Sequence, residues 1–460
     1  MIRKLICGVS ATGAALFTAT AAWAAEAVET VSEAAGTPIA AATTEVAETV
    51  AAVPNPGNNA WMMTATVLVL MMILPGLALF YGGLTRSKNM LSTMTQIGGA
   101  ATLAMLIWVM WGYSTAFGPE GNAFFAWGNL FLGSVTPETT AATFSDEVIS
   151  EYVFVSFQMT FAAITTALVL GATVERLKFS AVMLFTAIWL TIVYFPIAHM
   201  VWADGGLLFE MGALDFAGGT VVHINAGVTA LVLALVLGKR VGYPSEPMPP
   251  HSLTLTMVGT GLLWVGWFGF NAGSELEADG IAGLAMVNTF VATAAGALAW
   301  MVVERLAGHK GSALGFCSGV IAGLVAITPA AGNSGPFGAI VLGIIASVVA
   351  YYAVAKLKPM LGYDDALDVF GIHGVAGIVG AIGTGIVYQP SLGGPGDGST
   401  PMGEQVIIQI TAVAVAIAWS AIGTAIVAYI VKAVTGLRVS PEVEREGLDI
   451  GEHGERAYNY

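Results

Sequence analysis

Charged side chains are scarce in this chain. Only 10% of its 460 residues are Asp, Glu, Lys or Arg, whereas 56% are hydrophobic. A soluble domain usually carries about 25% charged residues. The polar surface is therefore too small to keep a globule of this length in water. We conclude that lipid is the solvent for most of the chain.

Basic residues and cysteines are also few. The chain has 16 Lys and Arg against 30 Asp and Glu, a formal charge of −14, which argues against a nucleic-acid partner because such a partner needs basic patches. Of its two cysteines, Cys7 lies in a segment that we expect to be removed, and Cys317 lies in an apolar stretch. We therefore expect neither an intrachain disulfide nor a cysteine-based metal site.

The N-terminus has the pattern of a secretory signal. Arg3 and Lys4 precede an apolar run that ends in Ala22-Trp-Ala24, so residues 1–24 are predicted to be a signal peptide. Residues 25–56 are rich in Ala, Thr, Glu and Val and are predicted to be a flexible periplasmic leader. The alternative is an uncleaved signal anchor.

Apolar runs of about 20 residues recur from Trp61 onward, and this length crosses a hydrocarbon core of about 30 Å. They predict an all-α polytopic membrane protein with eleven transmembrane helices. The predicted spans are 61–82, 96–117, 152–173, 180–201, 217–238, 253–273, 281–304, 312–330, 336–355, 368–388 and 404–432.

The basic residues predict the orientation of these spans. After the signal, every Lys and Arg falls at or beyond the same-side ends of the spans, and the opposite loops (118–151, 202–216, 274–280, 331–335 and 389–403) contain none. The positive-inside rule makes the basic side cytoplasmic. We therefore predict a multi-pass protein of the cell inner membrane with a periplasmic N-terminus and a cytoplasmic C-terminus.

Five spans followed by five more place equivalent helices in opposite orientations, which is the arrangement of an inverted repeat. Asp215 and His223 open span five, and Asp368 and His373 open span ten. Span eleven is then an extra C-terminal helix. Spans eight and ten also carry regularly spaced glycines that favour close helix crossings: Gly315, Gly319 and Gly323, and Gly371, Gly374, Gly377, Gly380 and Gly383.

His223 and His373 are polar groups expected at membrane depth, where each needs an explanation. One isolated histidine would most simply be a packing residue. Two, on repeat-related helices, favour a shared site. A metal or haem pair is the other reading, since two histidines can ligate one ion, but no third ligand or attachment motif accompanies them. By helix rise, His223 lies near the outer side and His373 near the inner side, so they meet only if both helix starts are recessed.

Aromatic residues are predicted to gather at the outer ends of several spans. Membrane proteins commonly place aromatic belts there, but ring faces beside a hydroxyl also suit a small cation, at about 0.5–2 kcal/mol per ring. The residues are Phe157, Phe161, Trp202, Trp267, Phe270 and Ser274. Asp215 begins span five on the same side, where we expect it to cap the helix rather than exchange protons directly.

Four segments together resemble the hallmark motifs of the ammonium transporter (Amt) family. They are residues 80–89 (FYGGLTRSKN), 215–225 (DFAGGTVVHIN), 266–274 (GWFGFNAGS) and 368–374 (DVFGIHG). The likeness covers the chain from about Asn55 to the C-terminus, including the tail. Ser274 and Trp202 at the mouth suit the Amt branch better than the related Rhesus branch.

The resemblance implies a homotrimer with one hydrophobic pore per subunit, and it assigns roles to the residues above. Trp202, Phe161 and Ser274 would bind ammonium at an external site, with Phe161 and Phe270 stacked as a gate beneath it. Phe157 and Trp267 would line this region, Asp215 would be the carboxylate needed for transport, and His223 and His373 would be the twin pore histidines.

The predicted function is transmembrane transport of ammonium or ammonia, with methylammonium as an analogue. Residues 57–435 would form the membrane domain, and residues 436–460 a cytoplasmic regulatory tail that contacts a neighbouring subunit and a PII-type signal protein. The alternatives are an ammonium sensor with little flux and a membrane enzyme or redox protein that uses the histidine pair. No nucleophile–base set or phosphate loop is evident, so we expect no enzyme activity and no cofactor.

Overall fold

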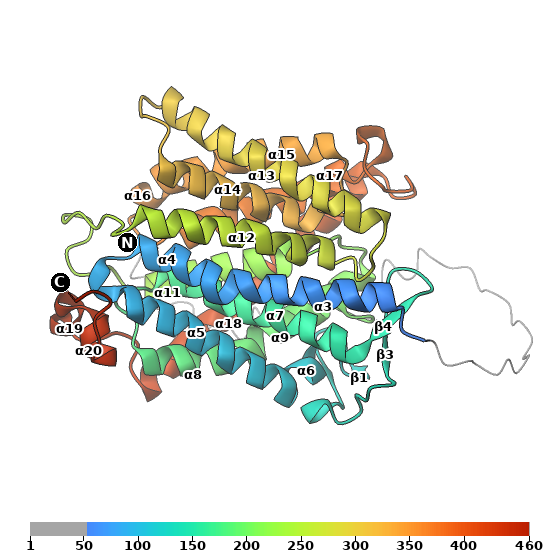
Figure 1. Cartoon of the computed structure of the whole chain (residues 1–460), viewed down its shortest axis with the longest axis horizontal. Helices are drawn as coiled ribbons and strands as arrows, with labels where there is room; N and C mark the ends of the chain where they lie inside the picture. The colour runs from blue at the N-terminus through green and yellow to red at the C-terminus, as the bar shows by residue number, and fades with distance from the viewer. Residues whose placement is uncertain (1–52, 460) are drawn as a thin grey trace, which may run out of the picture. The chain divides into compact units, whose positions relative to one another are not determined.

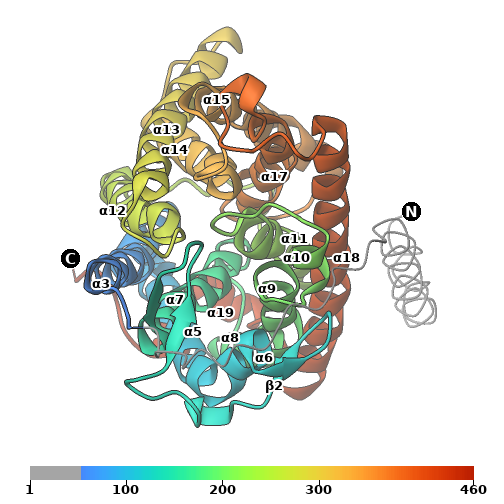
Figure 2. The same ribbon diagram turned by 90° about the vertical axis from the view of Figure 1, so that its right-hand side faces the viewer.

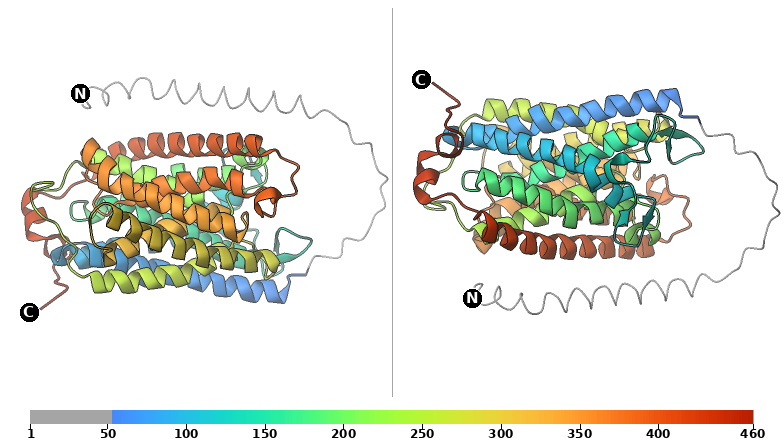
Figure 3. Two further views of the ribbon diagram at one scale, coloured as in Figure 1. Left: turned by 90° about the horizontal axis from the view of Figure 1, so that it is seen from above. Right: turned by 90° about the horizontal axis from the view of Figure 1, so that it is seen from below.

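The computed structural model describes residues 53–459. The predicted signal peptide and nearly all of the predicted leader lie outside these residues. Within the described part, eleven helical segments are long and apolar enough to cross a membrane, which confirms the predicted number. Their axes run side by side along the long direction of the bundle (Figure 1; Figure 3).

Several spans combine α-helix with a π-helical or 3-10 turn. Spans one to five are α3 (Pro56–Met71), η1 (Met72–Leu77) and α4 (Ala78–Leu84); η2 (Ser87–Asn89), α5 (Met90–Ile107), η3 (Trp108–Gly112) and α6 (Tyr113–Phe117); α7 (Glu151–Val169) and η5 (Leu170–Ala172); α8 (Phe179–Trp189), η6 (Leu190–Tyr194) and α9 (Phe195–Trp202), followed by α10 (Leu207–Glu210); and η7 (Gly219–Ile224) and α11 (Asn225–Leu237).

In the second half, spans eight, nine and ten also contain a π-helical or 3-10 turn, whereas spans six, seven and eleven are single α-helices. Spans six to eleven are α12 (Leu253–Gly273); α13 (Gly280–Leu306); α14 (Ala313–Ile327) and η8 (Thr328–Ala330); α15 (Pro336–Tyr352), η9 (Ala353–Leu357) and α16 (Lys358–Leu361); η10 (Phe370–Val375) and α17 (Ala376–Val387); and α18 (Met402–Val434).

Two small hairpins and two 3-10 turns lie in the loops at one end of the bundle, and two short helices lie at the other end (Figure 1). We call these ends the outer and inner faces, after the orientation predicted from the basic residues. The outer elements are β1 (Glu120–Gly121), β2 (Ala126–Trp127), η4 (Leu130–Leu132), β3 (Thr140–Ala142), β4 (Val148–Ser150) and η11 (Pro390–Leu392), and the inner ones are α19 (Pro441–Glu446) and α20 (Leu448–His453). Both hairpins are antiparallel.

Polar caps define where several spans begin. The side chain of Asn55 accepts hydrogen bonds from the backbone N–H groups at the start of α3, and Ser252, Asp279 and Ser312 do the same for α12, α13 and α14. Such residues satisfy N–H groups that have no partner within the helix. Local sequence therefore fixes where these four helices begin.

Glycines set the closest helix crossings, as the sequence predicted. A Cβ added at Gly319 would lie 2.7 Å from the carbonyl oxygen of Gly296, and one at Gly323 would lie 2.5 Å from that of Ala292. A Cβ at Gly380 in α17 would lie 2.3 Å from the carbonyl oxygen of Ala326. These distances are too short for any side chain, so α14 packs against α13 and α17 through backbone contact.

Candidate functional site

Aromatic rings form a continuous stack just inside the outer face. The rings of Phe161 and Phe270 lie 4.2 Å apart and nearly parallel, at 12°. Trp202 meets Phe161 edge-on at 5.7 Å, and Phe157 lies 4.9 Å from it on the same helix face. Both stacked phenylalanines are fully buried.

Two further predicted residues join this group through backbone groups. The Ser274 hydroxyl donates to the carbonyl oxygen of Phe270 at 2.9 Å. The Trp202 indole donates to the carbonyl oxygen of Asp215 at 2.8 Å. These two hydrogen bonds connect the aromatic group to the end of α12 and to the start of span five.

The two histidines meet beneath the phenylalanine pair. Nδ1 of His223 lies 3.2 Å from Nδ1 of His373, with the rings stacked at 5.3 Å. Trp267 stacks on the other side of His223 at 5.3 Å and 20°, and Phe270 lies 6.0 Å from the same ring. Nε2 of His223 is buried and has no hydrogen-bond partner among the described residues.

Recessed helix starts bring these histidines together. Span five becomes helical only at Gly219 and span ten only at Phe370, each two residues later than predicted. Asp215 is 8% exposed at the recessed start. Its carboxylate accepts four backbone N–H bonds of 2.6–3.0 Å, from Gly218, Gly219, Thr220 and Val221. Asp215 is thus the expected cap, and its partners belong to the turn that carries His223.

The cap of span ten is Asp365. The internal repeat in the sequence had instead paired Asp368 with Asp215. Asp365 is fully buried, and its Oδ2 accepts from the backbone N–H of Phe370 at 2.8 Å. Asp368 instead pairs with Lys358 at 2.6 Å. Burial raises the pKa of Asp365 to about 6, although the Lys358 charge opposes this shift. The signal that could have identified it is the Asp364–Asp365 pair directly before the span.

Both histidines lie in π-helical turns, η7 and η10. Such turns recur at functional sites, and the sequence did not predict them. The helices cross directly below: a Cβ added at Gly227 would lie 2.3 Å from Cα of Gly374, and one at Gly377 would lie 3.2 Å from Cβ of His223. Two positions without side chains therefore allow the imidazoles to reach each other.

A narrow cavity continues from the histidines. Besides His223, His373, Trp267 and Phe270, its lining is aliphatic or aromatic, and comprises Met72, Leu77, Phe80, Ile164, Leu168, Val222, Leu263 and Ile321. The indole of Trp267 is turned away to donate to the hydroxyl of Thr328 at 2.9 Å, a partner that sequence reasoning missed. Among residues 53–459, no group of three or more His, Cys, Asp or Glu side chains could hold a metal ion.

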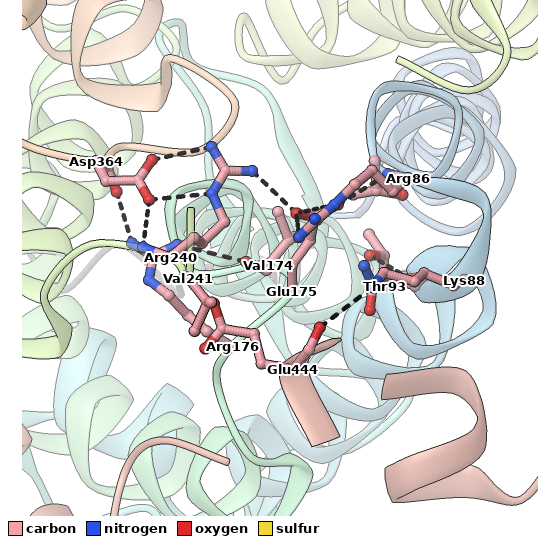
Figure 4. Close-up of polar contacts among 12 residues, drawn as sticks. Arg86, Lys88, Thr93, Val174, Glu175, Arg176, Arg240, Val241, Asp364 and Glu444 are labelled. Atoms are coloured by element: carbon pink, nitrogen blue, oxygen red, sulfur yellow. Dashed lines mark hydrogen bonds and ion pairs between the residues drawn. The ribbon is translucent and has the colours of Figure 1, made fainter. Parts of the chain in front are cut away.

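An ion-pair cluster joins the inner ends of several spans (Figure 4). Arg240 bonds Asp364 through two nitrogens, at 2.9 and 3.0 Å, and also reaches Glu175 at 3.1 Å. Arg86 bonds the same Glu175 at 2.6 Å. Burial opposes ionisation of Glu175, but the hydrogen bond from Arg86 and the charge of Arg240 lower its pKa overall. Asp364 directly precedes Asp365, so this cluster is continuous with the start of span ten.

The C-terminal tail packs onto the same face of its own chain. Glu444 accepts from Arg438 at 2.7 Å and from the backbone N–H of Val241 at 2.6 Å. The carboxylate of Asp449 accepts from the backbone N–H of Ser92 at 2.8 Å. Figure 3 shows α19 and α20 at this end of the bundle. The tail thus bridges spans two and five.

Comparison with known proteins gives consistent results. The family model described as Ammonium Transporter Family matches residues 60–458. A protein named ammonium transporter in Aquifex aeolicus is 51% identical, covering 88% of this chain and 93% of its own. One of the same name in Bacillus subtilis is 45% identical, covering 87% and 98%.

Solved structures are similar over most of the chain. The crystal structure of Candida albicans Mep2 matches with a TM-score of 0.76 and 36% identity, covering 85% of this chain and 87% of that one. A structure titled Sensor Amt Protein matches with a TM-score of 0.79 and 30% identity, covering 86% and 98%. Because the family model spans nearly all of the described residues and the relatives match over most of both chains, the chain belongs to the ammonium transporter family.

Proposed function

We propose that this chain binds ammonium at its outer mouth, removes one proton and passes ammonia through the apolar cavity. One observation carries the proposal: Trp202, Phe161, Phe270, His223 and His373 form an unbroken series of ring contacts from the outer face to the interior.

The mouth offers ammonium a favourable first position. The faces of Trp202 and Phe161 attract a cation by about 0.5–2 kcal/mol each, and the hydroxyl oxygen of Ser274 can accept one of its hydrogen bonds. Asp215 lies behind this position, with its carbonyl oxygen on Trp202 and its carboxylate on the helix start. Its negative charge favours a cation nearby.

Deprotonation follows from the lining of the cavity. Moving a bare ammonium ion into so apolar a passage would cost many kcal/mol, because nothing there replaces its water shell. Ammonia is neutral and escapes most of this cost. A potassium ion has no proton to lose, and the same barrier excludes it.

The histidine pair is suited to hold and relay the proton. Only one of two neutral imidazoles can donate in the Nδ1–Nδ1 hydrogen bond, so the other must accept. When a proton binds Nε2 of His223, the Nδ1 proton of His223 can move to Nδ1 of His373. His373 then releases the proton on its own Nε2. Each ring remains neutral before and after the step.

The assembly and partners are part of the same proposal. The proposed assembly is a homotrimer with one pore per subunit, in the inner membrane with the C-terminus in the cytoplasm. The proposed regulator is a PII-type protein at the inner face. Resemblance to the family supports both. The ordered tail on the inner face offers such a partner a defined surface. A purely sensory role is not favoured, since both curated relatives described above are named transporters.

Flux and current measured together in proteoliposomes test the mechanism. We expect His223→Ala and His373→Ala each to reduce methylammonium flux strongly or to admit potassium current. His309→Ala, at an exposed position of the inner loop 307–312, is the matched control and should behave as wild type. Wild-type flux and selectivity in both pore variants would remove the histidines from the mechanism, and absence of flux in the wild-type protein would favour the sensor.

A further inference from the structure

The loop between spans two and three carries an exposed apolar cluster that the pathway does not use. Phe125, Trp127, Leu130 and Phe131 are 43%, 43%, 61% and 65% exposed. We call these four residues the outer aromatic patch. The rings of Phe125 and Trp127 lie 5.8 Å apart. Four exposed apolar residues within seven positions of one loop indicate a surface that lipid or another molecule covers.

The turn that presents half of this patch has an unfavourable backbone. Phe131 and Leu132 both have φ of 55°, in the left-handed region that large L-residues avoid. Buried Asn129 stabilises the turn: its backbone N–H donates to the Ser114 hydroxyl at 2.9 Å, and its side-chain oxygen accepts from Ser134 at 3.0 Å. The fold therefore maintains a strained turn whose apolar side chains are exposed.

The patch lies beside a surface that faces lipid. The loop begins at Phe117, the last residue of span two, and Phe124 stacks on Trp419 of α18 at 6.0 Å and 13°. The same helix exposes Ile407 and Ile410, as expected for a span in contact with acyl chains. Figure 2 looks onto the outer face and shows α6 and β2 at the edge of the bundle next to α18, away from its centre.

We infer that the outer aromatic patch inserts into the boundary between headgroups and acyl chains of the surrounding bilayer and anchors this edge of the protein there. Aromatic residues prefer this depth. Trp127 has the required amphipathic character, because its indole N–H donates to Glu120 at 2.7 Å while its ring remains exposed. Residues 118–151 contain no Lys or Arg. The attraction is therefore apolar and does not require anionic lipid.

Site-directed spin labelling tests this inference without reference to transport. A nitroxide is attached at Phe131→Cys in the full chain carrying Cys7→Ser and Cys317→Ser, reconstituted in phosphatidylcholine vesicles. Collision with oxygen, which concentrates in lipid, is compared with collision with a water-soluble nickel chelate. Leu106→Cys, exposed on α5, is the lipid reference, and Asp397→Cys, exposed in the outer loop 389–403, is the water reference.

We expect the oxygen-to-nickel ratio at position 131 to exceed that at position 397 by roughly threefold or more and to approach that at position 106. The ratio should not change when anionic lipid is added or salt is raised. Leu130→Cys should give the same result and replaces the first variant if that one fails to fold. A ratio equal to that at position 397 overturns the inference. Shielding from both reagents with spin–spin broadening also overturns it, because it would mean that the patch contacts a second copy of the chain.

Discussion

The crossing of the two histidine helices gives the sharpest quantitative test of the site. Alanine at Gly227 places a Cβ 2.3 Å from Cα and N of Gly374, and ordinary carbon contacts begin near 3.4 Å. Both obstructing atoms belong to backbone, so the helices must separate by about 1 Å. The Nδ1–Nδ1 distance of 3.2 Å then exceeds 4 Å, which is beyond any hydrogen bond.

Gly227→Ala should therefore lose stability and function together. Overpacking of this kind typically costs about 1–3 kcal/mol. Loss of a hydrogen bond worth about 0.5–1.5 kcal/mol slows a step that needs it by roughly two- to tenfold. The assays are thermal unfolding in detergent and methylammonium flux in proteoliposomes.

Two further glycines make this a graded series. Gly377→Ala approaches the Cβ of His223 to 3.2 Å, so a shift of a few tenths of an ångström accommodates it and a small loss is expected. Gly261→Ala in α12 meets no heavy atom within 4 Å in the described part of the chain. All three changes gain similar helix propensity, about 0.5–1 kcal/mol, so their differences isolate the crossing. If Gly227→Ala matched Gly261→Ala in both assays, the reasoning would be refuted.

Three other substitutions test the recessed start, the ion-pair cluster and the tail. Asp215→Asn keeps one acceptor oxygen for four N–H groups, so unfolding free energy should fall by about 1–3 kcal/mol and flux should fall with it; unchanged flux would limit Asp215 to capping. Glu175→Gln should destabilise the protein at pH 7 by about 1–3 kcal/mol, because partly exposed Arg86 loses its carboxylate partner while buried Arg240 keeps only Asp364. The pKa of Glu175 is lowered, so its contribution is complete above the unfolded value of about 4.3. It is lost as pH falls through the lower folded pKa, so the difference in Tm from wild type should narrow below about pH 4; a constant difference would contradict the charge argument. Asp449→Ala should release the tail and speed its cleavage by trypsin at Arg445, with the membrane part intact; equal cleavage rates would count against this anchor.

Sequence determined the number and approximate placement of the spans, because each is a local property, although span two begins at Ser87, nine residues before its predicted start. A run of about 20 apolar residues must cross the membrane as a helix to satisfy its backbone groups, and caps such as Asn55 and Ser312 are encoded within three residues of the helices they start. The mouth residues and both histidines were also identifiable, since the motifs that contain them are contiguous. The depth at which a helix begins within the bundle is not encoded in the local sequence. The starts of spans five and ten were both predicted two residues too early.

Only the tertiary structure decided which polar groups meet. The two imidazoles are 150 residues apart in the chain, and their contact depends on two π-helical turns and on a backbone crossing at Gly227 that composition does not specify. The same reason explains the exchange of roles between Asp365 and Asp368. Both carboxylates precede span ten. The backbone turns at Asp368, where φ is 61°, and Lys358 pairs with the Asp368 side chain. Asp365 is therefore the residue that caps the helix. Helix length and cap chemistry are encoded locally, whereas the register between helices is set by the packing of the whole bundle.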